Sequence, residues 1–570
     1  MLGNHHVIFS PIERVIIILL VVAAFILGIL GYFDYFDGVE DVTFSDVIYA
    51  TLGLFVLEFE GQPSDKLPIL LDIARWVAPI SLVYAGIKTI LALMGDRLDY
   101  IKLKCMRNHA VICGLNEYSL LTIKDLVAGG IKVIVIEAGK DSPFIGVAKE
   151  QGILVLFADA TDKKNLERVN LRWASHLLVT TGDDSRNLEI AYQAFELHQA
   201  FPKYQHLKCV VDVDSNEFSA ALYTQAIFNQ DYENFSAQVL NYSKQAARLL
   251  VRDFGPDTVI SLNKRLDKVL RILIIGNHPF VEDFILSFAA IGHYGLKEKL
   301  HISFFGDGVS ARIKALIEKR PMLVNIVTIT YADVAPSMLN NHHTAASIRQ
   351  FSPDVIYLCA FNLKYTMVWV RALLDLQLDI PFLVAEFMNS LALEKFKTQL
   401  EDRMLSFIPL LSLSCESEQV FSVKQDRLAK AIHDNYVAKQ VAAGDMPSNN
   451  ASLVDWRMLP ESLKDSNRSQ ADHLDIKLRL LEIEHLASGD DMQKILTDET
   501  VEKMANVEHS RWMAEKLLAG WQVTEGKKDA ARRLSPDLVP WEELGEIEKQ
   551  KDRDTVQVIP EVVALRESLK

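Results

Sequence analysis

The chain has 570 residues, enough for roughly three or four domains, and 49% of them are hydrophobic. Its formal net charge is −15 at pH 7 and it has no long basic stripe, which argues against a nucleic-acid-binding protein. Its five cysteines form no CxxC pair and no cluster with histidine, so the sequence favours reduced thiols and predicts no metal site.

Most of the hydrophobic excess lies in the first 100 residues. The run VIIILLVVAAFILGILGYF at 15–33 carries no charge, and at ~1.5 Å per residue it spans ~28 Å, close to a bilayer core of about 30 Å. A signal peptide is the alternative, but no small-residue cleavage site follows. A second run is interrupted by Asp72, Arg75 and Lys88. We expect a span at about 73–94 whose polar side faces a partner helix or water, or whose charges reach the bilayer surface.

Charge asymmetry around the two spans predicts their topology. Eight acidic residues and one basic residue lie between Asp34 and Lys66. The second span is followed by basic residues, namely Arg97, Lys102, Lys104 and Arg107. The positive-inside rule therefore places both termini in the cytoplasm and the acidic link outside. The sequence predicts a multi-pass protein of the bacterial inner (cell) membrane.

The segment TFSDVIYATLGLFVLEFEG, at about 43–61, is apolar but carries three acids. Irregular backbone at membrane depth persists only where it lines a cavity or is buried in protein, so we expect this segment to re-enter the membrane as a pore loop. FSDVIYATLGLF is the expected pore helix, and VLEFEG is the expected descending filter strand. The candidate pore residues are Val56, Leu57, Glu58, Phe59, Glu60 and Gly61.

Two spans around a pore loop resemble the two-span potassium channels, whose subunits assemble as homotetramers. The Thr-Val-Gly-Tyr-Gly filter of that family is absent, so the resemblance does not extend to potassium selectivity. In a tetramer, Glu58 or Glu60 would form an acidic ring, which favours monovalent cations. The alternative is an acidic external loop with no filter role.

From His109 the pattern changes to alternating strands and helices, beginning with HAVICGLNEYSLLTIKDLVAGGIKVIVIEAG. This alternation predicts a parallel, doubly wound α/β sheet whose first turn can hold the phosphates of a dinucleotide. The glycine fingerprint is degraded, because Gly114 is present but Asn116 and Ser119 occupy the other two glycine positions. Glu137 ends the second strand, where a ribose-binding acid is expected.

The run over about 107–240 resembles the regulator-of-potassium-conductance (RCK) domain of the TrkA-N type. The resemblance is carried by ADAT at 158–161 and TGDDSRN at 181–187. It implies a Rossmann fold in a cytoplasmic ring that pulls on the pore helices. It also implies NAD(H) or an adenine nucleotide at the first Rossmann turn, held by Gly114, Asn116, Ser119, Glu137 and Asp159. A ring-forming scaffold that binds nothing is the alternative.

A second alternating region begins with the apolar strand RILII and Gly276. It resembles a diverged RCK-type Rossmann unit, and two units per subunit would give an eight-domain ring in a tetramer. Asp307 follows the second strand, where a structural turn is favoured over a ribose contact. His342 and His343 are expected in a loop, without a metal.

Beyond about 415 the strands stop, helical patterns take over, and one plan occurs twice. The first copy has His433, Trp456 and Glu461, and the second has His509, Trp541 and Glu546. Both copies, over about 420–560, resemble the ryanodine-receptor (RyR) repeat domain, most closely in MANVEHSRWMAEKLLAGWQV and LVPWEEL. The resemblance implies a non-enzymatic module that senses a nucleotide second messenger, with bacterial relatives in operons resembling phage-defence systems that use cyclic nucleotides.

The side chains of this region suit such a ligand. Tryptophan stacks on bases, and arginine forks hold phosphates. The candidates are Asn467, Arg468, Trp512, Trp521, Trp541 and Arg553. Asp552 is a further candidate for reading a base edge or a ribose. Core packing is the alternative for the tryptophans, ion pairs with nearby acids are favoured for the arginines, and helix packing is favoured for the two histidines.

The expected architecture is thus a membrane α module of two spans and a re-entrant pore loop, then doubly wound α/β Rossmann-like domains, then an all-α-rich RyR repeat domain. The expected boundaries are 1–104, 105–262, 263–412 and 413–570. The sequence favours a ligand-gated cation channel with a defensive role implied by resemblance alone. The alternative is a non-conducting, membrane-anchored regulatory subunit of an ion transporter. No Gly-x-Ser-x-Gly, HExxH or Walker motif indicates an enzyme.

Overall fold

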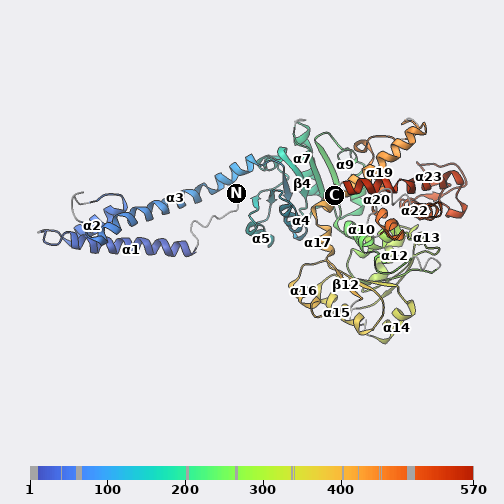
Figure 1. Ribbon diagram of the computed structural model, residues 1–570, viewed down its shortest axis with the longest axis horizontal. Helices are drawn as coiled ribbons and strands as arrows, with labels where there is room; N and C mark the ends of the chain where they lie inside the picture. Colours follow the sequence, from blue (N-terminus) through green and yellow to red (C-terminus); the bar gives the residue numbers. More distant parts are fainter. Residues whose placement is uncertain are drawn as a thin grey trace. The chain divides into compact units, whose positions relative to one another are not determined.

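The computed structural model describes residues 11–568 except 40, 60–66, 201–203, 263–267, 336–337, 339–340, 401–403, 422, 448–449, 451 and 484–494. The chain divides into two compact units (Figure 1). Unit 1 comprises Met1–Arg107, Ile134–Asp159 and Lys164–Asn170. Unit 2 comprises Asn108–Val133, Ala160–Lys163 and Leu171–Lys570.

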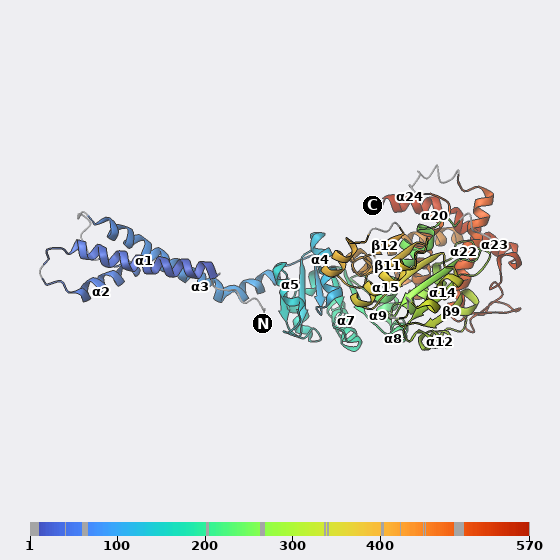
Figure 2. The same ribbon diagram turned by 90° about the horizontal axis from the view of Figure 1, so that it is seen from below.

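Unit 1 contains three N-terminal helices, α1 (Pro11–Tyr35), α2 (Phe44–Phe55) and α3 (Ile69–Cys105). Two stretches, Val15–Tyr35 and Ile69–Ile90, are long and apolar enough to cross a membrane. Helices α1 and α3 lie side by side (Figure 2), and they approach closely at Gly31. A Cβ there would lie 2.5 Å from the backbone nitrogen of Leu71, so only glycine permits this packing.

Helix α2 packs against α1 and α3 through the buried side chains Val47, Ala50, Thr51 and Leu54. The polar side of α3 has partners, as expected for a span with charges. Lys88 contacts Glu13 of α1 at 2.9 Å, and Arg75 pairs with Asp72 one turn away at 2.9 Å. These pairs lower the cost of placing charges on an apolar helix.

The first sheet has the strand order β3-β2-β1-β4-β5-β6. The pairs β2/β3, β1/β4, β4/β5 and β5/β6 are parallel. Its strands are apolar runs such as VIVIE, as expected for a sheet covered on both faces. The elements are β1 (His109–Cys113), α4 (Glu117–Ala128), β2 (Val133–Glu137), α5 (Phe144–Glu150), β3 (Leu154–Phe157), α6 (Lys163–Arg168), β4 (Ala174–Val179), α7 (Asp184–Gln199), β5 (Leu207–Asp212), α8 (Asn216–Leu222), α9 (Ala226–Asn229), β6 (Phe235–Leu240) and α10 (Tyr242–Phe254).

The second sheet, in unit 2, repeats this topology with the order β12-β11-β10-β7-β8-β9. All five of these strand pairs are parallel. Two Rossmann-like sheets are therefore present, as the alternation predicted. The elements are β7 (Arg271–Gly276), α11 (Val281–Ile291), β8 (His301–Gly306), α12 (Val309–Lys319), α13 (Leu323–Ile326), β9 (Thr328–Asp333), α14 (His342–Phe351), β10 (Val355–Cys359), α15 (Leu363–Asp375), β11 (Phe382–Ala385), α16 (Leu391–Lys397) and β12 (Leu405–Ile408).

The C-terminal region is mainly helical. Short helices α17 (Leu410–Ser414) and α18 (Ser417–Val420) lead into a repeated plan of long helix, 3₁₀ turn and helix. The first copy is α19 (Val423–Ala442), η4 (Trp456–Met458) and α20 (Glu461–Leu480). The second copy is α22 (Asp498–Leu518), η5 (Trp541–Glu543) and α23 (Glu546–Gln557), followed by α24 (Ile559–Ser568).

Two details differ from the sequence-based expectations. Strands do not stop at 415, because β13 (Gln522–Val523) and β14 (Leu534–Ser535) form a small two-stranded sheet in the second copy. His342 and His343 are not in a loop but open helix α14, where Asn341 caps the N-terminus by accepting a hydrogen bond from the His343 amide.

Candidate functional site

The first Rossmann turn, after β1, is built around Gly114. Its φ of +96° and the 2.3 Å that would separate a Cβ from the Thr180 carbonyl oxygen both require glycine. Asn116 and Ser119 form a reciprocal cap at the start of α4, in which each side chain accepts a hydrogen bond from the other's backbone amide at 2.9 Å. The two substituted fingerprint positions therefore stabilise the helix N-terminus.

The Asn116 amide also donates to the Thr180 hydroxyl at 3.0 Å, which joins the turn to the end of β4. Thr180 in turn donates to Asp212 at the end of β5, at 2.8 Å. Burial raises the pKa of Asp212 to about 7, although the Thr180 hydrogen bond opposes the shift. Asp212 is a carboxyl at the carboxyl edge of the sheet that sequence reasoning missed.

The TGDDSRN segment links the ends of β4 and β5. Asn187 accepts hydrogen bonds from the Thr181 amide and hydroxyl and donates to the Asp212 carbonyl oxygen at 2.9 Å. Asp183 caps helix α7 by accepting from the amides of Ser185 and Arg186. This motif therefore fixes the edge at which Rossmann folds bind ligands.

Glu137 and Asp159, the other two residues expected at this turn, belong to unit 1. The Glu137 carboxylate accepts a hydrogen bond from the Gly139 amide at 2.8 Å, just after β2 ends. The Asp159 carbonyl oxygen accepts from the Asn165 side chain at 2.9 Å. Both residues thus stabilise local turns after their strands.

The second Rossmann turn is filled by side chains of the chain itself. Gly276 is again obligatory, because a Cβ would lie 2.0 Å from the Cys359 carbonyl oxygen. The His278 ring stacks on Phe387 with centroids 3.9 Å apart. Arg312 donates to the carbonyl oxygens of residues 277–279, at 3.2–3.3 Å. Asp307 lies in an exposed turn after β8.

The C-terminal repeat is matched residue by residue. His433 Nε2 lies 2.8 Å from the Val454 carbonyl oxygen, and His509 Nε2 lies 2.8 Å from that of Val539. Each histidine ring also contacts the tryptophan of its own 3₁₀ turn, with centroids 6.0 and 5.8 Å apart. Each histidine therefore attaches its long helix to the loop and 3₁₀ turn of the same copy.

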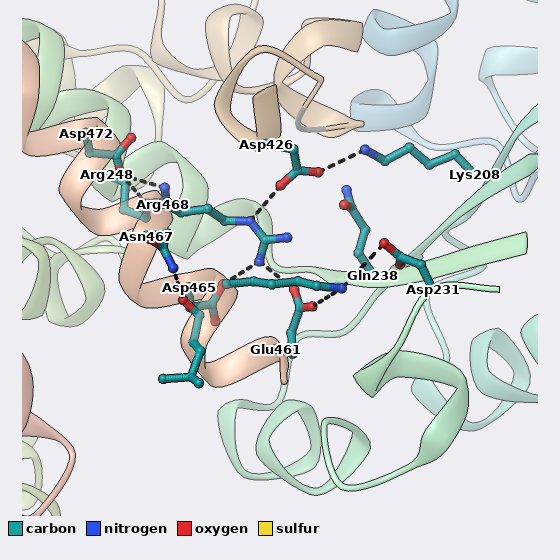
Figure 3. Close-up of polar contacts among 12 residues, drawn as sticks. Lys208, Asp231, Gln238, Arg248, Asp426, Glu461, Asp465, Asn467, Arg468 and Asp472 are labelled. Atoms are coloured by element: carbon teal, nitrogen blue, oxygen red, sulfur yellow. Dashed lines mark hydrogen bonds and ion pairs between the residues drawn. The ribbon is translucent and has the colours of Figure 1, made fainter. Parts of the chain in front are cut away.

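Each copy also has one arginine surrounded by acids. In the first copy Arg468 donates to Asp426, Glu461 and Asp465 (Figure 3). Lys208 of β5 shares Asp426 at 3.1 Å, so this cluster connects the repeat to the first sheet. Arg468 is only 8% exposed. Asn467 donates to the Leu463 carbonyl oxygen of its own helix and points away from the guanidinium group.

In the second copy Arg553 donates to Glu502 and Glu546, which occupy the positions of Asp426 and Glu461. Here the acids are open to solvent, with side-chain exposures of 45% and 74%. Asp552, at the position of Asn467, contacts His509 Nδ1 at 3.2 Å. Intramolecular ion pairs thus hold both arginines.

The three candidate tryptophans do not form one stacking site. Trp512 and Trp541 both contact the His509 ring, and Trp541 also donates to Glu502. Trp521 instead contacts the ammonium groups of Lys516 and Lys528, which lie over its ring at 5.8 and 5.9 Å from the centroid. Trp541 is thus buried in the repeat, and Trp512 is half-buried beside the same histidine.

A buried charge cluster joins the two copies. Lys477 of α20 lies 2.6 Å from Glu508 of α22, and Arg511 contacts the same carboxylate at 2.9 Å. Burial raises the pKa of Glu508, but Arg511 and Lys477 together hold it well below its usual range. Glu508 therefore remains ionised in the interior.

The candidate pore residues are described only up to Phe59. Helix α2 ends at Phe55, and the next two residues, Val56 and Leu57, are 63% and 75% exposed. Leu57 has a φ of +67°, and the Glu58 amide donates back to the Gly53 carbonyl oxygen at 2.9 Å. The Phe59 ring packs against Tyr32 of α1. Glu60 and Gly61 lie outside the described residues, and 56–59 form a turn and irregular chain instead of a strand.

Comparisons with known proteins match two parts of the chain. Residues 110–230 match the TrkA-N domain model, and residues 493–565 match the RyR domain model. An uncharacterized protein of Methanothermus fervidus is 30% identical over 97 residues, which is 17% of this chain and 15% of that protein. The match therefore covers far less than two thirds of that relative.

Several solved structures of the GsuK channel match this chain with low identity and low TM-scores. The GsuK channel itself shares 13% identity with a TM-score of 0.36, covering 72% of this chain and 97% of that chain. The structure of GsuK bound to ADP shares 13% identity with a TM-score of 0.36, covering 71% of this chain and 96% of that chain. The structure of the GsuK channel bound to NAD shares 12% identity with a TM-score of 0.37, covering 72% of this chain and 84% of that chain. The family models show that this chain contains a TrkA-N domain at 110–230 and an RyR domain at 493–565.

Proposed function

We propose that this chain is the subunit of a ligand-gated cation channel. The observation that carries the proposal is the combination, in one chain, of two membrane-length helices flanking a short apolar helix with a TrkA-N domain and an RyR domain. In this proposal four copies surround a pore, monovalent cations pass, and both termini lie on the cytoplasmic side of a bacterial inner membrane. The chain has no enzymatic role.

Gating follows from a difference in ligand affinity between closed and open states. A nucleotide that binds the open state more tightly shifts the equilibrium by that difference. The first Rossmann turn offers one nucleotide site, for NAD(H) or an adenine nucleotide, and the RyR pair offers the other, for a nucleotide second messenger. In the anti-phage role, messenger binding opens the pore and depolarises the cell.

Ion flux from liposomes tests the proposal. The full-length protein is reconstituted, and potassium and sodium efflux is measured with a panel of mono-, di- and cyclic nucleotides. We expect efflux that depends on one nucleotide class and falls when Glu58 is replaced by glutamine. Asp37→Asn, in the link before α2, is the matched control and should leave efflux unchanged.

The second candidate is a membrane-anchored regulator that conducts nothing. It is favoured by the lack of a Thr-Val-Gly-Tyr-Gly filter between the two spans. The regulator would be supported, and the channel rejected, if the reconstituted protein gave no ion efflux with any nucleotide and co-purified stably with a separate transporter.

A further inference from the structure

A cavity of about 480 Å³ lies within unit 2, where the first RyR copy packs on the two Rossmann folds. Its volume is in the range of small-molecule sites. Three helices supply much of its wall, namely α10, α11 and α20, and strand β6 supplies part of the rest. The cavity is separate from both Rossmann turns and from the tryptophans of the second copy.

One side of the cavity is apolar. Leu240 of β6 and Ile291 of α11 are buried there, with exposures of 4% and 3%, and Leu286 and Leu518 add further aliphatic surface. Tyr223 also lines the cavity, and Asp465, Glu461 and Arg468 are among the charged groups near it. A ring-shaped or aliphatic group that packs here would be stabilised because its apolar surface leaves water.

The acids that line the cavity already have partners. Asp472 accepts from Arg248 and lies 3.4 Å from Arg252. Glu461 and Asp465 both accept from Arg468. Asp283 accepts from the Ser243 hydroxyl. Asp472, Glu461 and Asp465 therefore have cationic partners within the protein, and Asp283 has a hydroxyl donor.

Several hydrogen-bond donors on the cavity wall are not used by contacts among the described residues. Arg468 uses Nε and Nη1 for its three acids (Figure 3), and its Nη2 makes no hydrogen bond to a described residue. No described carboxylate lies within ion-pair distance of the Lys244 ammonium group, which is exposed at the wall. Arg320 uses one nitrogen, for the Leu518 carbonyl oxygen. A guanidinium group has five N–H donors, so most of those of Arg320 remain.

We propose that this cavity binds a phosphorylated small molecule of the nucleoside monophosphate class. Its phosphate would accept from Lys244, Arg320 and the Nη2 of Arg468, and its base would pack on Tyr223 and the aliphatic wall. The consequence for gating rests on the proposed function, because a ligand here would hold the RyR copy against both Rossmann folds. Binding itself is independent of conduction.

Calorimetry with the full-length protein in detergent tests the assignment, using adenosine 5′-monophosphate as the probe. Inorganic phosphate and adenosine are titrated separately for comparison. We expect Lys244→Met and Arg320→Met each to weaken binding of the probe about tenfold, because each removes a charge-assisted hydrogen bond. Lys319→Met is the matched control, since Lys319 pairs with Glu217 and does not line the cavity. Ala290→Phe should abolish binding by filling the cavity.

Photolabelling then locates the probe directly. With 8-azido-adenosine 5′-monophosphate, we expect labelled peptides from α10, α11 or α20. Labelling of 109–128 instead would place the site at the first Rossmann turn and overturn the proposal. Unchanged affinity in Lys244→Met and Arg320→Met would also overturn it, as would phosphate binding as tightly as the nucleotide. Binding at the cavity without any ion flux would leave this assignment standing and reject the channel function.

Discussion

The two arginine clusters are alike in sequence but differ in burial, and this difference sets their contributions to stability. Removing Arg468 leaves Glu461, only 3% exposed, and Asp426 without their main cationic partner. Breaking one side of a buried ion pair costs about 3–5 kcal/mol. Removing Arg553 leaves acids that water can solvate.

We therefore predict that Arg468→Met lowers the thermal unfolding midpoint by several degrees and that Arg553→Met changes it little. Differential scanning fluorimetry of the two purified variants makes the comparison, with each serving as the other's control. Equal shifts in the two variants would contradict the assigned difference in burial.

Buried neutral histidines make the stability sensitive to acid. Burial lowers the pKa of His198 to about 4, and its buried Nε2 has no hydrogen-bond partner among the residues that the structure describes. The unfolded chain, with a histidine pKa of about 6.5, takes up a proton first as the pH falls. The stabilising contribution is therefore complete above pH 6.5 and is lost between there and about pH 4.

His198→Phe removes this titration. We predict that the variant becomes more stable relative to the parent chain as the pH falls, by about 2 kcal/mol at pH 5 compared with pH 7.5. Chemical denaturation at both pH values measures the difference. His343→Phe, at an exposed position of α14, is the control and should show no such pH dependence.

Part of each arginine cluster could be read from the sequence. Glu461 and Glu546 lie seven residues before their arginines, two turns along the same helix, so helical spacing predicts the contact. Asp426 and Lys208 come from other elements, and no local pattern indicates them. Of the cavity donors, Arg468 was a candidate from the sequence, but Lys244 and Arg320 were missed, because a wall assembled from several elements has no signature in any one of them.

At the scale of elements, the contact between α1 and α3 depends on one glycine. A Cβ at residue 31 would lie 2.5 Å from the Leu71 nitrogen and 2.7 Å from its Cα, and backbone atoms cannot move aside as a flexible side chain does. Gly86, on α3, has no atom within 4 Å of the corresponding position.

We predict that Gly31→Ala separates the two helices, lowers the unfolding temperature in detergent and broadens the elution profile in size-exclusion chromatography. Gly86→Ala should be neutral or slightly stabilising, because alanine has the higher helix propensity. If Gly86→Ala lowered the unfolding temperature and broadened the elution profile while Gly31→Ala did neither, the close approach at Gly31 would not be what holds the helices together.

Strong apolar runs allowed most elements to be predicted. RILII became β7, and the similar apolar runs HISFFG and VIYLC form β8 and β10, because buried parallel strands need continuous apolar sequence. Strand β12 has a weaker signal, since LSFI is short and follows a charged stretch. The helix at His342 was missed because the cap at Asn341 was read as part of a loop. Strands β13 and β14 have two residues each, too few for any periodicity.

At the scale of the whole molecule, helix α20 attaches the RyR region to the Rossmann folds of unit 2. Asp472, only 2% exposed, forms ion pairs with Arg248 and Arg252 of α10. Arg479 of the same helix contacts Asp257 at 2.6 Å, and His473 Nε2 lies 3.0 Å from the His293 carbonyl oxygen. These contacts join residues 180 to 224 positions apart in the sequence, so we expect α20 and α10 to be stabilised together.

We predict that Asp472→Asn raises amide hydrogen exchange in α10 and α20 while leaving β1 and β4 protected. The asparagine keeps the shape of the side chain but leaves two arginines with a weaker acceptor. Asp434→Asn is the matched control, because Asp434 is exposed and pairs with Lys430 on its own helix. Exchange confined to the substituted turn of α20 would argue against long-range coupling.

The occupied second Rossmann turn has a consequence for stoichiometry. Arg312 holds three successive carbonyl oxygens there, and burial keeps the pKa of His278 at about 4, so its stacked ring is uncharged at neutral pH and offers no cation to a phosphate. A chain with two Rossmann folds should thus titrate with no more than one Rossmann-bound dinucleotide. An assembly of four chains would then saturate at four equivalents of dinucleotide. The second Rossmann fold of each chain would have a structural role and bind no dinucleotide.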